Sequence, residues 1–164
     1  MKKLKIYLDT SIINFLKVED SHEYQHITEL FFETVVATEK VDVYISKIVL
    51  EEINNTEDFN KRKELLDVFI KYPNIKTLIA EDDNVEEIAF LAKSYLDNGI
   101  IPHKKIADAL HIAYSTVFEM DILLSWNFKH LANINKEQKI LIVNKLNGYN
   151  YPFRMTNPLE VLYD

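Results

Sequence analysis

Residues Ile6–Asn14 read IYLDTSIIN, a short apolar run that stops abruptly on the carboxylate of Asp9. A run of β-branched and aromatic residues this short is typical of a buried strand. The acid at its end is informative, because open α/β sheets bind ligands outside the carboxyl ends of their strands. The alternative is that Asp9, Thr10 and Ser11 only cap the helix that follows. The role of Asp9 therefore depends on whether other acids reach the same place.

Strand and helix patterns alternate through the rest of the chain. Further strands are predicted at 41–45, 75–80, 122–124 and 153–155. Helices are predicted between them, with starts at Ser21, Ser46, Thr56, Asp83, Lys105 and Asn135, and with Gly99 and Gly148 ending two of them. Alternation of this kind favours a mostly parallel sheet of about five strands covered by helices on both faces. The prediction is a single α/β domain spanning residues 1–164.

Composition excludes several classes of protein. The chain has no cysteine, which rules out disulfides and Cys-ligated zinc. Its two glycines, Gly99 and Gly148, cannot form a GxGxxG turn or a Walker loop, so Rossmann dehydrogenases and P-loop NTPases are excluded. A net charge of −7 argues against a broad phosphate-binding surface, although a cation-binding carboxylate cluster would contribute to that charge.

The first ten residues, MKKLKIYLDT, meet an acid before the apolar core of a signal peptide could form. No apolar run approaches the length of a membrane span. We therefore expect a cytoplasmic protein that does not associate with membranes.

Two more acids stand in positions that suggest a site. Glu52 shares a predicted helix face with Ile48 and Val49, although an isolated helical Glu is usually solvated. Asp108 lies in the very apolar segment KIADALHIAY, where an ionised carboxylate is costly unless a cation or donors meet it. The alternative for Asp108 is a narrow polar stripe on the helix surface, and the functional interpretation is favoured.

Asn127 follows the predicted strand 122–124 as Asp9 follows the first strand, and it can cap the short turn after it. If these two strands are neighbours where the strand order reverses, Asp9, Asn127 and the two helical acids meet in one crevice. Such a group of oxygen donors suits Mg²⁺, which keeps several waters and is held by few carboxylates together with substrate phosphate.

At this point four motifs, in order, resemble the PIN-domain family, in particular the VapC-like toxins and their stand-alone bacterial relatives. They are YLDTSIIN, ISKIVLEEI, KIADALHIAY and DILLSWNFKHL, and the late segment NKLNGYNYPFRMTNPLEVL is also similar. The resemblance covers nearly the whole chain. It implies a three-layer α/β/α PIN-like fold and a Mg²⁺- or Mn²⁺-dependent endoribonuclease that hydrolyses RNA phosphodiester bonds.

Carried over residue by residue, the resemblance places the metal-binding acids at Asp9, Glu52 and Asp108. The fourth catalytic position of the family, commonly Asp, falls on Asn127 here, which lowers the charge of the site by one and puts the number of metal ions in doubt. The resemblance also implies a small antitoxin protein as partner, and we expect self-association through the helical layer as a homodimer.

Further residues are candidates for orienting the acids or contacting substrate. Thr10, Ser11 and Asn14 could hold Asp9 through hydrogen bonds, and His111, three residues after Asp108, could support the acids from behind. Trp126 is interpreted first as a core residue, with nucleobase stacking as the alternative. Lysines near the predicted site could form a local rim for phosphate on an acidic protein, namely Lys47, Lys104, Lys105 and Lys129.

Other functions stay open at this stage. Phosphoaspartyl phosphatases also place an Asp after their first strand, but they need a second Asp where this chain has Ser11. A flap-type DNA nuclease uses the same general chemistry as a PIN ribonuclease. From another class altogether, a catalytically silent PIN fold that only binds RNA or protein is compatible with Asn127 and the net negative charge.

Overall fold

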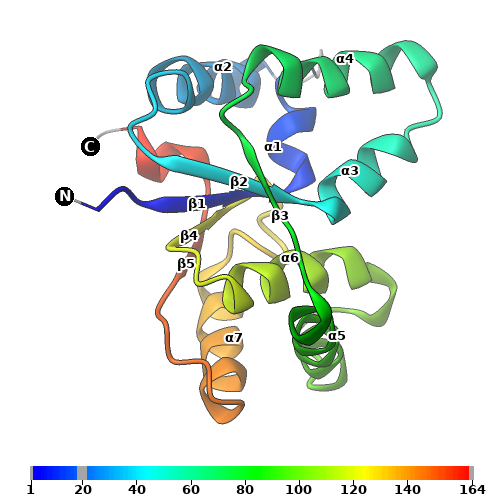
Figure 1. Ribbon diagram of the computed structural model, residues 1–164, viewed down its shortest axis with the longest axis vertical. Coiled ribbons are helices and arrows are strands. Elements are labelled where there is room, and N and C mark those ends of the chain that lie inside the picture. The colour runs from blue at the N-terminus through cyan, green and yellow to red at the C-terminus, as the bar shows by residue number, and fades with distance from the viewer. Residues whose placement is uncertain (1, 18–21, 163–164) are drawn as a thin grey trace.

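The protein was analysed as a computed structural model, which describes residues 2–17 and 22–162. Its centre is a five-stranded, fully parallel sheet of order β3-β2-β1-β4-β5 (Figure 1). The strands are β1 (Lys5–Leu8), β2 (Asp42–Ser46), β3 (Lys76–Leu78), β4 (Ile122–Leu124) and β5 (Arg154–Thr156). The predicted parallel sheet of about five strands is therefore confirmed.

Helices cover both faces of this sheet and make the three layers that were predicted (Figure 1). On one side lie α1 (Thr10–Asn14), α2 (His22–Phe31) and α4 (Phe59–Lys71). On the other side lie α5 (Asp82–Asp97), α6 (Ile106–Val117) and α7 (Ile134–Leu146). The helix α3 (Lys47–Asn54) contacts both α1 and α6. A π-helical turn (Phe32–Val36) extends α2, and short 3₁₀ turns occupy His103–Lys105 and Pro158–Val161.

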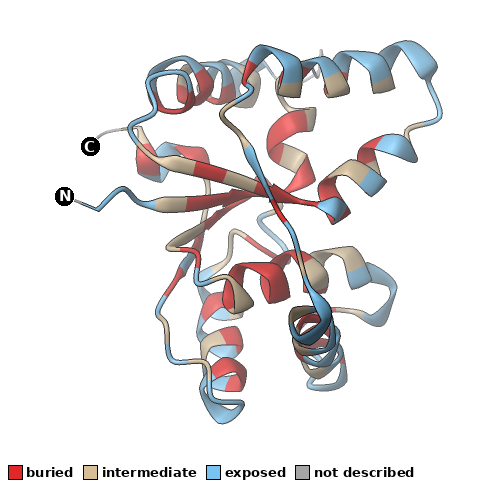
Figure 2. Cartoon of the chain, viewed as in Figure 1, coloured by how far each residue is buried: buried red, intermediate tan, exposed pale blue. Residues whose placement is uncertain are grey.

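The core lies in two layers, one on each side of the sheet (Figure 2). Ile6, Tyr7 and Leu8 of β1 are completely buried, because β1 is the central strand and helices cover both of its faces. This burial explains why the first strand is a continuous apolar run rather than an alternating one.

The order of the strands reverses at β1, which pairs with β2 on one side and with β4 on the other. Leu8 is in register with Leu124, and the backbone N–H of Asp9 donates to the carbonyl oxygen of Leu124 at 3.2 Å. The residues after β1 and after β4 consequently lie side by side, as the sequence argument required.

Three helix starts differ from the prediction, those of α4, α5 and α7. Ser46 caps α3 as expected, through a bond from the backbone N–H of Ile48 to its hydroxyl. The cap of α4 is Asp58 rather than Thr56, and the cap of α7 is Asn133 rather than Asn135. In these two cases the predicted and the observed capping residue are two positions apart, so the local sequence allows the helix to begin at either one. Packing of the apolar face of the helix then determines which start is used.

The predicted capping box at Asp83 is wrong as well, because α5 begins at Asp82 with Glu81 at the cap position and no side-chain cap bond. The predicted cap Ser21 lies outside the described residues. Gly99 and Gly148 follow the ends of α5 and α7 with positive φ angles of 70° and 87°, as expected for glycines that terminate helices. In the part of the chain that is described, no helix combines the length and apolar character that crossing a bilayer requires.

Candidate active site

One cavity of about 270 Å³ opens at the carboxyl end of the central strands. Its lining is almost entirely polar and comes from α1, α3, α6 and the loops after β1, α3 and β4. The residues are Asp9, Thr10, Ser11, Asn14, Glu52, Thr56, Asp108, His111 and Asn127. All four predicted catalytic residues are among them, so segments distant in sequence converge here.

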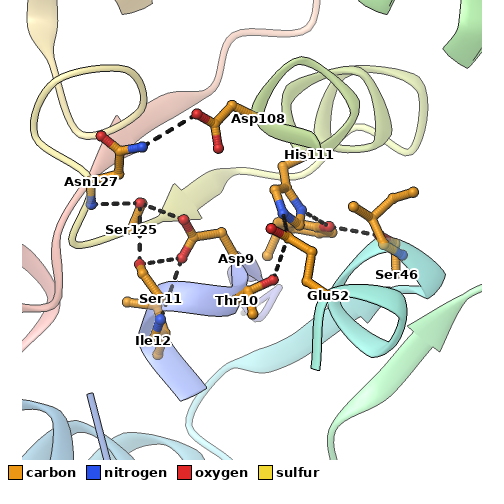
Figure 3. Close-up of polar contacts among 12 residues, drawn as sticks. Asp9, Thr10, Ser11, Ile12, Ser46, Glu52, Asp108, His111, Ser125 and Asn127 are labelled. Atoms are coloured by element: carbon orange, nitrogen blue, oxygen red, sulfur yellow. Dashed lines mark hydrogen bonds and ion pairs between the residues drawn. The ribbon is translucent and has the colours of Figure 1, made fainter. Parts of the chain in front are cut away.

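Asp9 is the most enclosed acid of the cavity, with 4% of its surface exposed. Its Oδ1 accepts bonds from the Ser11 hydroxyl at 2.6 Å and from the backbone N–H of Ile12 at 3.4 Å (Figure 3). Its Oδ2 accepts a bond from the Ser125 hydroxyl at 2.6 Å. Asp9 therefore caps α1 and faces the cavity at once, so the two interpretations of this residue do not exclude each other.

Glu52 reaches the cavity from α3 and is held through one oxygen. Its Oε1 accepts from the Thr10 hydroxyl at 2.6 Å and lies 2.7 Å from Nε2 of His111. A carboxylate can only accept hydrogen bonds, so Nε2 of His111 carries the hydrogen. Two donors on one oxygen fix the direction of the carboxylate and leave its second oxygen for another partner.

Behind Glu52, a buried chain of polar groups supports His111. The Tyr7 hydroxyl lies 2.6 Å from Nδ1 of His111 and 2.7 Å from the hydroxyl of Ser46. The Tyr7 hydroxyl and Nδ1 are joined by one hydrogen bond, and the Ser46 hydroxyl, which accepts the backbone N–H of Ile48, is the next group in the chain of contacts. Tyr7, Ser46 and His111 each have a hydrogen-bond partner in this arrangement, which sets the orientation of the His111 ring.

Asp108 and Asn127 form the opposite wall of the cavity. The Asn127 amide Nδ2 donates to Oδ2 of Asp108 at 3.3 Å (Figure 3). The Asn127 Oδ1 accepts the backbone N–H groups of Lys129 and His130 at 3.2 and 3.0 Å. Asn127 therefore caps the turn after it and also contacts the site.

The electrostatics of the three acids reflect their enclosure. Burial raises the pKa of Asp9, and the nearby Asp108 raises it further, while His111, Ser11 and Ser125 act in the opposite direction. Burial likewise raises the pKa of Asp108, with an added contribution from the charge of Glu52. Burial also acts to raise the pKa of Glu52, but the bond and charge of His111 and the bond from Thr10 outweigh it, so the net pKa is lowered.

The shifts of Asp9 and Asp108 come first from burial and second from repulsion between the acids of the cavity. Asp108 interacts unfavourably with both other acids, and two of the three carboxylates hold protons more tightly than in water. A divalent cation would relieve this repulsion, and the available donors are oxygens, the ligands that Mg²⁺ and Mn²⁺ prefer.

The cavity suits a divalent cation by the chemistry of its oxygen donors, although its side chains do not form a closed coordination shell. Among the described residues, no three acidic or histidine side chains stand close enough together to enclose an ion as they are. Mg²⁺ does not require such a cage, because it retains several waters and is usually held by one or two carboxylates together with substrate phosphate. The metal role of Asp9, Glu52 and Asp108 stays a prediction.

The side chain of Trp126 does not line the cavity. It is 5% exposed and packs against the rings of Phe15 and Tyr24, and its indole Nε1 donates to the Thr28 hydroxyl at 2.9 Å. Only its backbone N–H reaches the site, where it donates to the hydroxyl of Ser11 at 2.9 Å. This placement favours the core interpretation of Trp126 over nucleobase stacking.

The four lysines proposed as a phosphate rim, Lys47, Lys104, Lys105 and Lys129, are exposed, and none lines the cavity itself. Lys105 is close enough to lower the pKa of both Glu52 and Asp108. Lys104, Lys105 and Lys129, together with Lys136, also lower the pKa of the buried His130, after the larger effect of burial. Three of the predicted lysines therefore gather on one side of the site.

Two supporting residues were not predicted. Ser125 stands at the end of β4 and bonds both Asp9 and the backbone N–H of Asn127. Its place could have been found from strand alternation, which puts Ser125 and Asn127 on the same side of the chain. Tyr7 gave no such signal, because a tyrosine inside an apolar strand is indistinguishable from an ordinary core residue.

Solved structures of three protein complexes share this fold. VapBC2 from Rickettsia felis, bound to a DNA fragment from its promoter, aligns with a TM-score of 0.54 and 16% identity over 82% of this chain and 92% of the matched chain. DNA-bound VapBC from Salmonella typhimurium aligns with a TM-score of 0.56 and 12% identity over 94% and 98% of the two chains. VapBC-1 from nontypeable Haemophilus influenzae aligns with a TM-score of 0.58 and 13% identity over 95% and 99%.

At identities this low, the structural alignments establish the fold alone. That fold agrees with the PIN-like fold that the sequence motifs predicted. No protein-family model matches the chain, and no curated protein matches it either.

Proposed function

We propose that this chain is a Mg²⁺- or Mn²⁺-dependent endoribonuclease of the VapC-like PIN type. The observation that carries the proposal is the convergence of Asp9, Glu52 and Asp108, from three separate elements, on one oxygen-lined cavity at the carboxyl end of the sheet. Support comes from the order of the four sequence motifs and from the fold shared with VapBC structures.

In this proposal the three carboxylates would hold the ion, and Asn127 would complete or orient its surroundings. Once bound, the ion supplies an activated water and neutralises charge that develops on the scissile phosphate. Ser11 and Ser125 hold Asp9, Thr10 and His111 hold Glu52, and Asn127 holds Asp108, so each carboxylate has at least one donor that sets its direction. No side-chain nucleophile is needed.

RNA is the proposed substrate because the four sequence motifs resemble VapC-like ribonucleases, and on a protein of net charge −7 the bound ion would help to attract its phosphates. The lysines that gather beside the cavity, Lys104, Lys105 and Lys129, would contact phosphates of the strand on one side of the cleaved bond. Such contacts position the strand without reading its sequence.

The test compares cleavage of labelled single-stranded RNA by the wild type, Asp108→Asn and the exposed-acid control Asp83→Asn. With Mn²⁺ or Mg²⁺ present, the wild type and Asp83→Asn should cleave and Asp108→Asn should not, and EDTA should stop all cleavage. RNA that is bound but never cut, together with no Mn²⁺ binding by calorimetry, would identify a silent binding module instead. Cleavage confined to flapped DNA would identify a DNA nuclease.

We extend the proposal to a small antitoxin partner, since the structures that share the fold are VapBC assemblies. Expression of the wild-type chain in a bacterial host should then arrest growth, whereas Asp108→Asn should not. A small protein encoded beside the gene should restore growth and copurify with the chain. A ribonuclease that is active in vitro but harmless on expression would contradict this extension. The predicted homodimer is checked by light scattering of the purified chain.

A further inference from the structure

The residue next to Asn127 is an exposed aromatic side chain. Phe128 has 44% of its surface exposed, although it follows directly on a residue that lines the cavity. Consecutive Cα atoms are about 3.8 Å apart, so the backbone of Phe128 lies next to the proposed active site. A single exposed apolar side chain is common on protein surfaces and by itself needs no explanation.

What distinguishes Phe128 is that its backbone is held in place. Asn127 caps the turn through its side chain, and its carbonyl oxygen accepts the backbone N–H groups of Leu131 and Ala132 at 3.1 and 2.8 Å. From the other side, Nδ2 of Asn133 donates to the carbonyl oxygen of Phe128 at 3.1 Å. The ring therefore stands on a fixed backbone, and a ligand would lose little free energy in ordering it.

The ring is also supported from beneath by other aromatic rings. Its centroid lies 6.0 Å from Trp126, in an edge-to-face arrangement, and 5.9 Å from Tyr24. Trp126 is anchored in turn by Thr28 and packs on Phe15. The exposed side of Phe128 is thus the outer surface of a rigid aromatic cluster.

The other exposed phenylalanines differ in this respect. Phe59 on α4 and Phe90 on α5 are more exposed than Phe128, and neither packs on another aromatic ring within the described residues. Neither of them lines or adjoins the acidic cavity in sequence. Phe128 alone among these three combines support, rigidity and proximity to the site.

Positive charge surrounds the same turn. Lys129 follows Phe128 directly, and Lys104, Lys105, Lys129 and Lys136 all act on the buried His130 two residues further on. An exposed aromatic ring among cations, beside a site for a phosphodiester, is the combination with which proteins bind single-stranded nucleic acid.

We propose that Phe128 is a stacking platform for one nucleobase of the bound RNA, on a nucleotide next to the phosphate held in the cavity. This inference rests on the proposed ribonuclease function and adds a base subsite to it. Stacking tolerates every base, because each has a π-face, so Phe128 contributes affinity and register and does not read sequence. Nucleobase stacking, first considered for Trp126, is therefore assigned to Phe128, whose ring packs on Trp126.

The first experiment measures binding of labelled single-stranded RNA by fluorescence anisotropy in EDTA, where no cleavage occurs. Phe128→Ala should weaken binding by roughly 5- to 150-fold, the range that corresponds to 1–3 kcal/mol for one stacked base. Phe128→Tyr and Phe128→Trp should retain affinity, and the control Phe90→Ala should leave it unchanged. The dependence on salt should be the same in Phe128→Ala as in the wild type, whereas Lys129→Ala should reduce its slope.

A second experiment scans a single abasic nucleotide along the RNA. At one position, removal of the base should weaken RNA binding by the wild type as much as Phe128→Ala weakens binding of the intact RNA. With the base missing at that position, Phe128→Ala should bind no more weakly than it binds the intact RNA. Thermal unfolding of each variant checks that the fold is intact.

The outcomes separate the two proposals. If the wild type cleaves RNA and Phe128→Ala binds it equally well, the stacking subsite is overturned and the ribonuclease stands. If Phe128→Ala loses affinity but no abasic position matters, Phe128 serves packing and stacking is again overturned. A wild type that neither binds nor cleaves RNA overturns the ribonuclease and the subsite together.

Discussion

The hydroxyl of Tyr7 on β1 lies 2.6 Å from Nδ1 of His111 on α6, across a separation of 104 residues. Through the other nitrogen of the same ring, this contact reaches Glu52, 2.7 Å from Nε2. The central strand therefore sets the direction of a carboxylate in the cavity without contacting it. Three elements of the fold meet in this one chain of hydrogen bonds.

Tyr7→Phe should weaken Mn²⁺ binding while the fold persists. Removal of the hydroxyl leaves Nδ1 of His111 buried without its hydrogen-bond partner, which should cost about 1–3 kcal/mol of unfolding free energy. Loss of a partner behind a metal ligand typically lowers metal affinity by about 10- to 100-fold. Calorimetric titration with Mn²⁺ and urea unfolding measure the two effects.

The matched control for this change is Tyr95→Phe. Tyr95 is equally buried, and its hydroxyl donates to the side chain of Asn144. Neither residue lines the cavity. The Tyr95→Phe variant should be less stable than the wild type, and its affinity for Mn²⁺ should be unchanged. Equal Mn²⁺ affinity in Tyr7→Phe and the wild type would show that Tyr7 has only a structural role.

Asp108→Asn should stabilise the metal-free protein at neutral pH. Because burial, with a contribution from Glu52, raises the pKa of Asp108, the native state binds this proton more tightly than the unfolded chain. The stability that Asp108 contributes is therefore complete below its ordinary pKa of about 3.9 and is lost as the pH rises through the raised value. The amide of the variant keeps an acceptor oxygen for Asn127 and carries no charge at any pH.

Urea unfolding in EDTA, from about pH 3 to pH 8, measures this difference between the variant and the wild type. The advantage of Asp108→Asn should be small at the acid end and grow with pH until Asp108 is fully ionised. The shifts of Asp9 and Glu52 are present in both proteins and largely cancel in the difference. A difference that is constant over the whole range would refute the assignment to ionisation of Asp108.

Asn127→Asp should increase affinity for Mn²⁺. With three carboxylates the site has a formal charge of −3, so one divalent ion leaves −1 and a second would leave +1. We therefore predict one ion in the free wild-type protein, with a second arriving only with RNA. A further charge about 4 Å from the ion is worth roughly 4 kcal/mol at an effective dielectric constant of ~20. Dehydration and repulsion among the acids will absorb much of that gain.

The structure adds a cost to this variant. The Asn127 amide donates to Asp108 at 3.3 Å, and a carboxylate in its place would repel Asp108 instead. The metal-free variant should therefore be less stable than the wild type, although Asp remains a good cap for the turn. Calorimetry with Mn²⁺ yields affinity and stoichiometry for both proteins. Identical values would place Asn127 outside the metal site, with a capping role only.

Asn133→Ala should destabilise the protein by about 1 kcal/mol, the usual effect of losing a helix cap. The Asn133 side chain accepts the backbone N–H groups of Asn135 and Lys136 at 3.0 and 3.2 Å. Asn135→Ala is the matched control, since Asn135 lies inside the first turn and should change the unfolding free energy by less than half as much. Thermal or urea unfolding distinguishes the two, and a larger loss for Asn135→Ala would restore the cap first predicted.

The sequence by itself determined the alternation of strands and helices and the parallel sheet. Those features follow from local periodicity, because a continuous apolar run such as Ile6–Leu8 is stable only when both of its faces are covered. The end of that run at Asp9 and of the fourth strand at Leu124 could also be located, since polar residues interrupt each one. Helix starts were less well determined where two capping residues stood two positions apart, as at Asn133 and Asn135.

Only the tertiary structure decided which acid each supporting side chain holds, since Thr10, expected at Asp9, bonds Glu52 instead. Strand alternation puts Ser125 on the same side as Asn127, but Ser125 contacts Asp9 because β4 pairs with β1 in a register that brings Leu124 beside Leu8, and alternation does not specify that pairing. Tyr7 has the local surroundings of a core residue, and its contact with His111 arises from the packing of α6 against the sheet. Hydrogen bonds between distant segments depend on positions within a few tenths of an ångström, which periodicity does not encode. Packing of the whole core sets those positions, and so it determines the chemistry of the site.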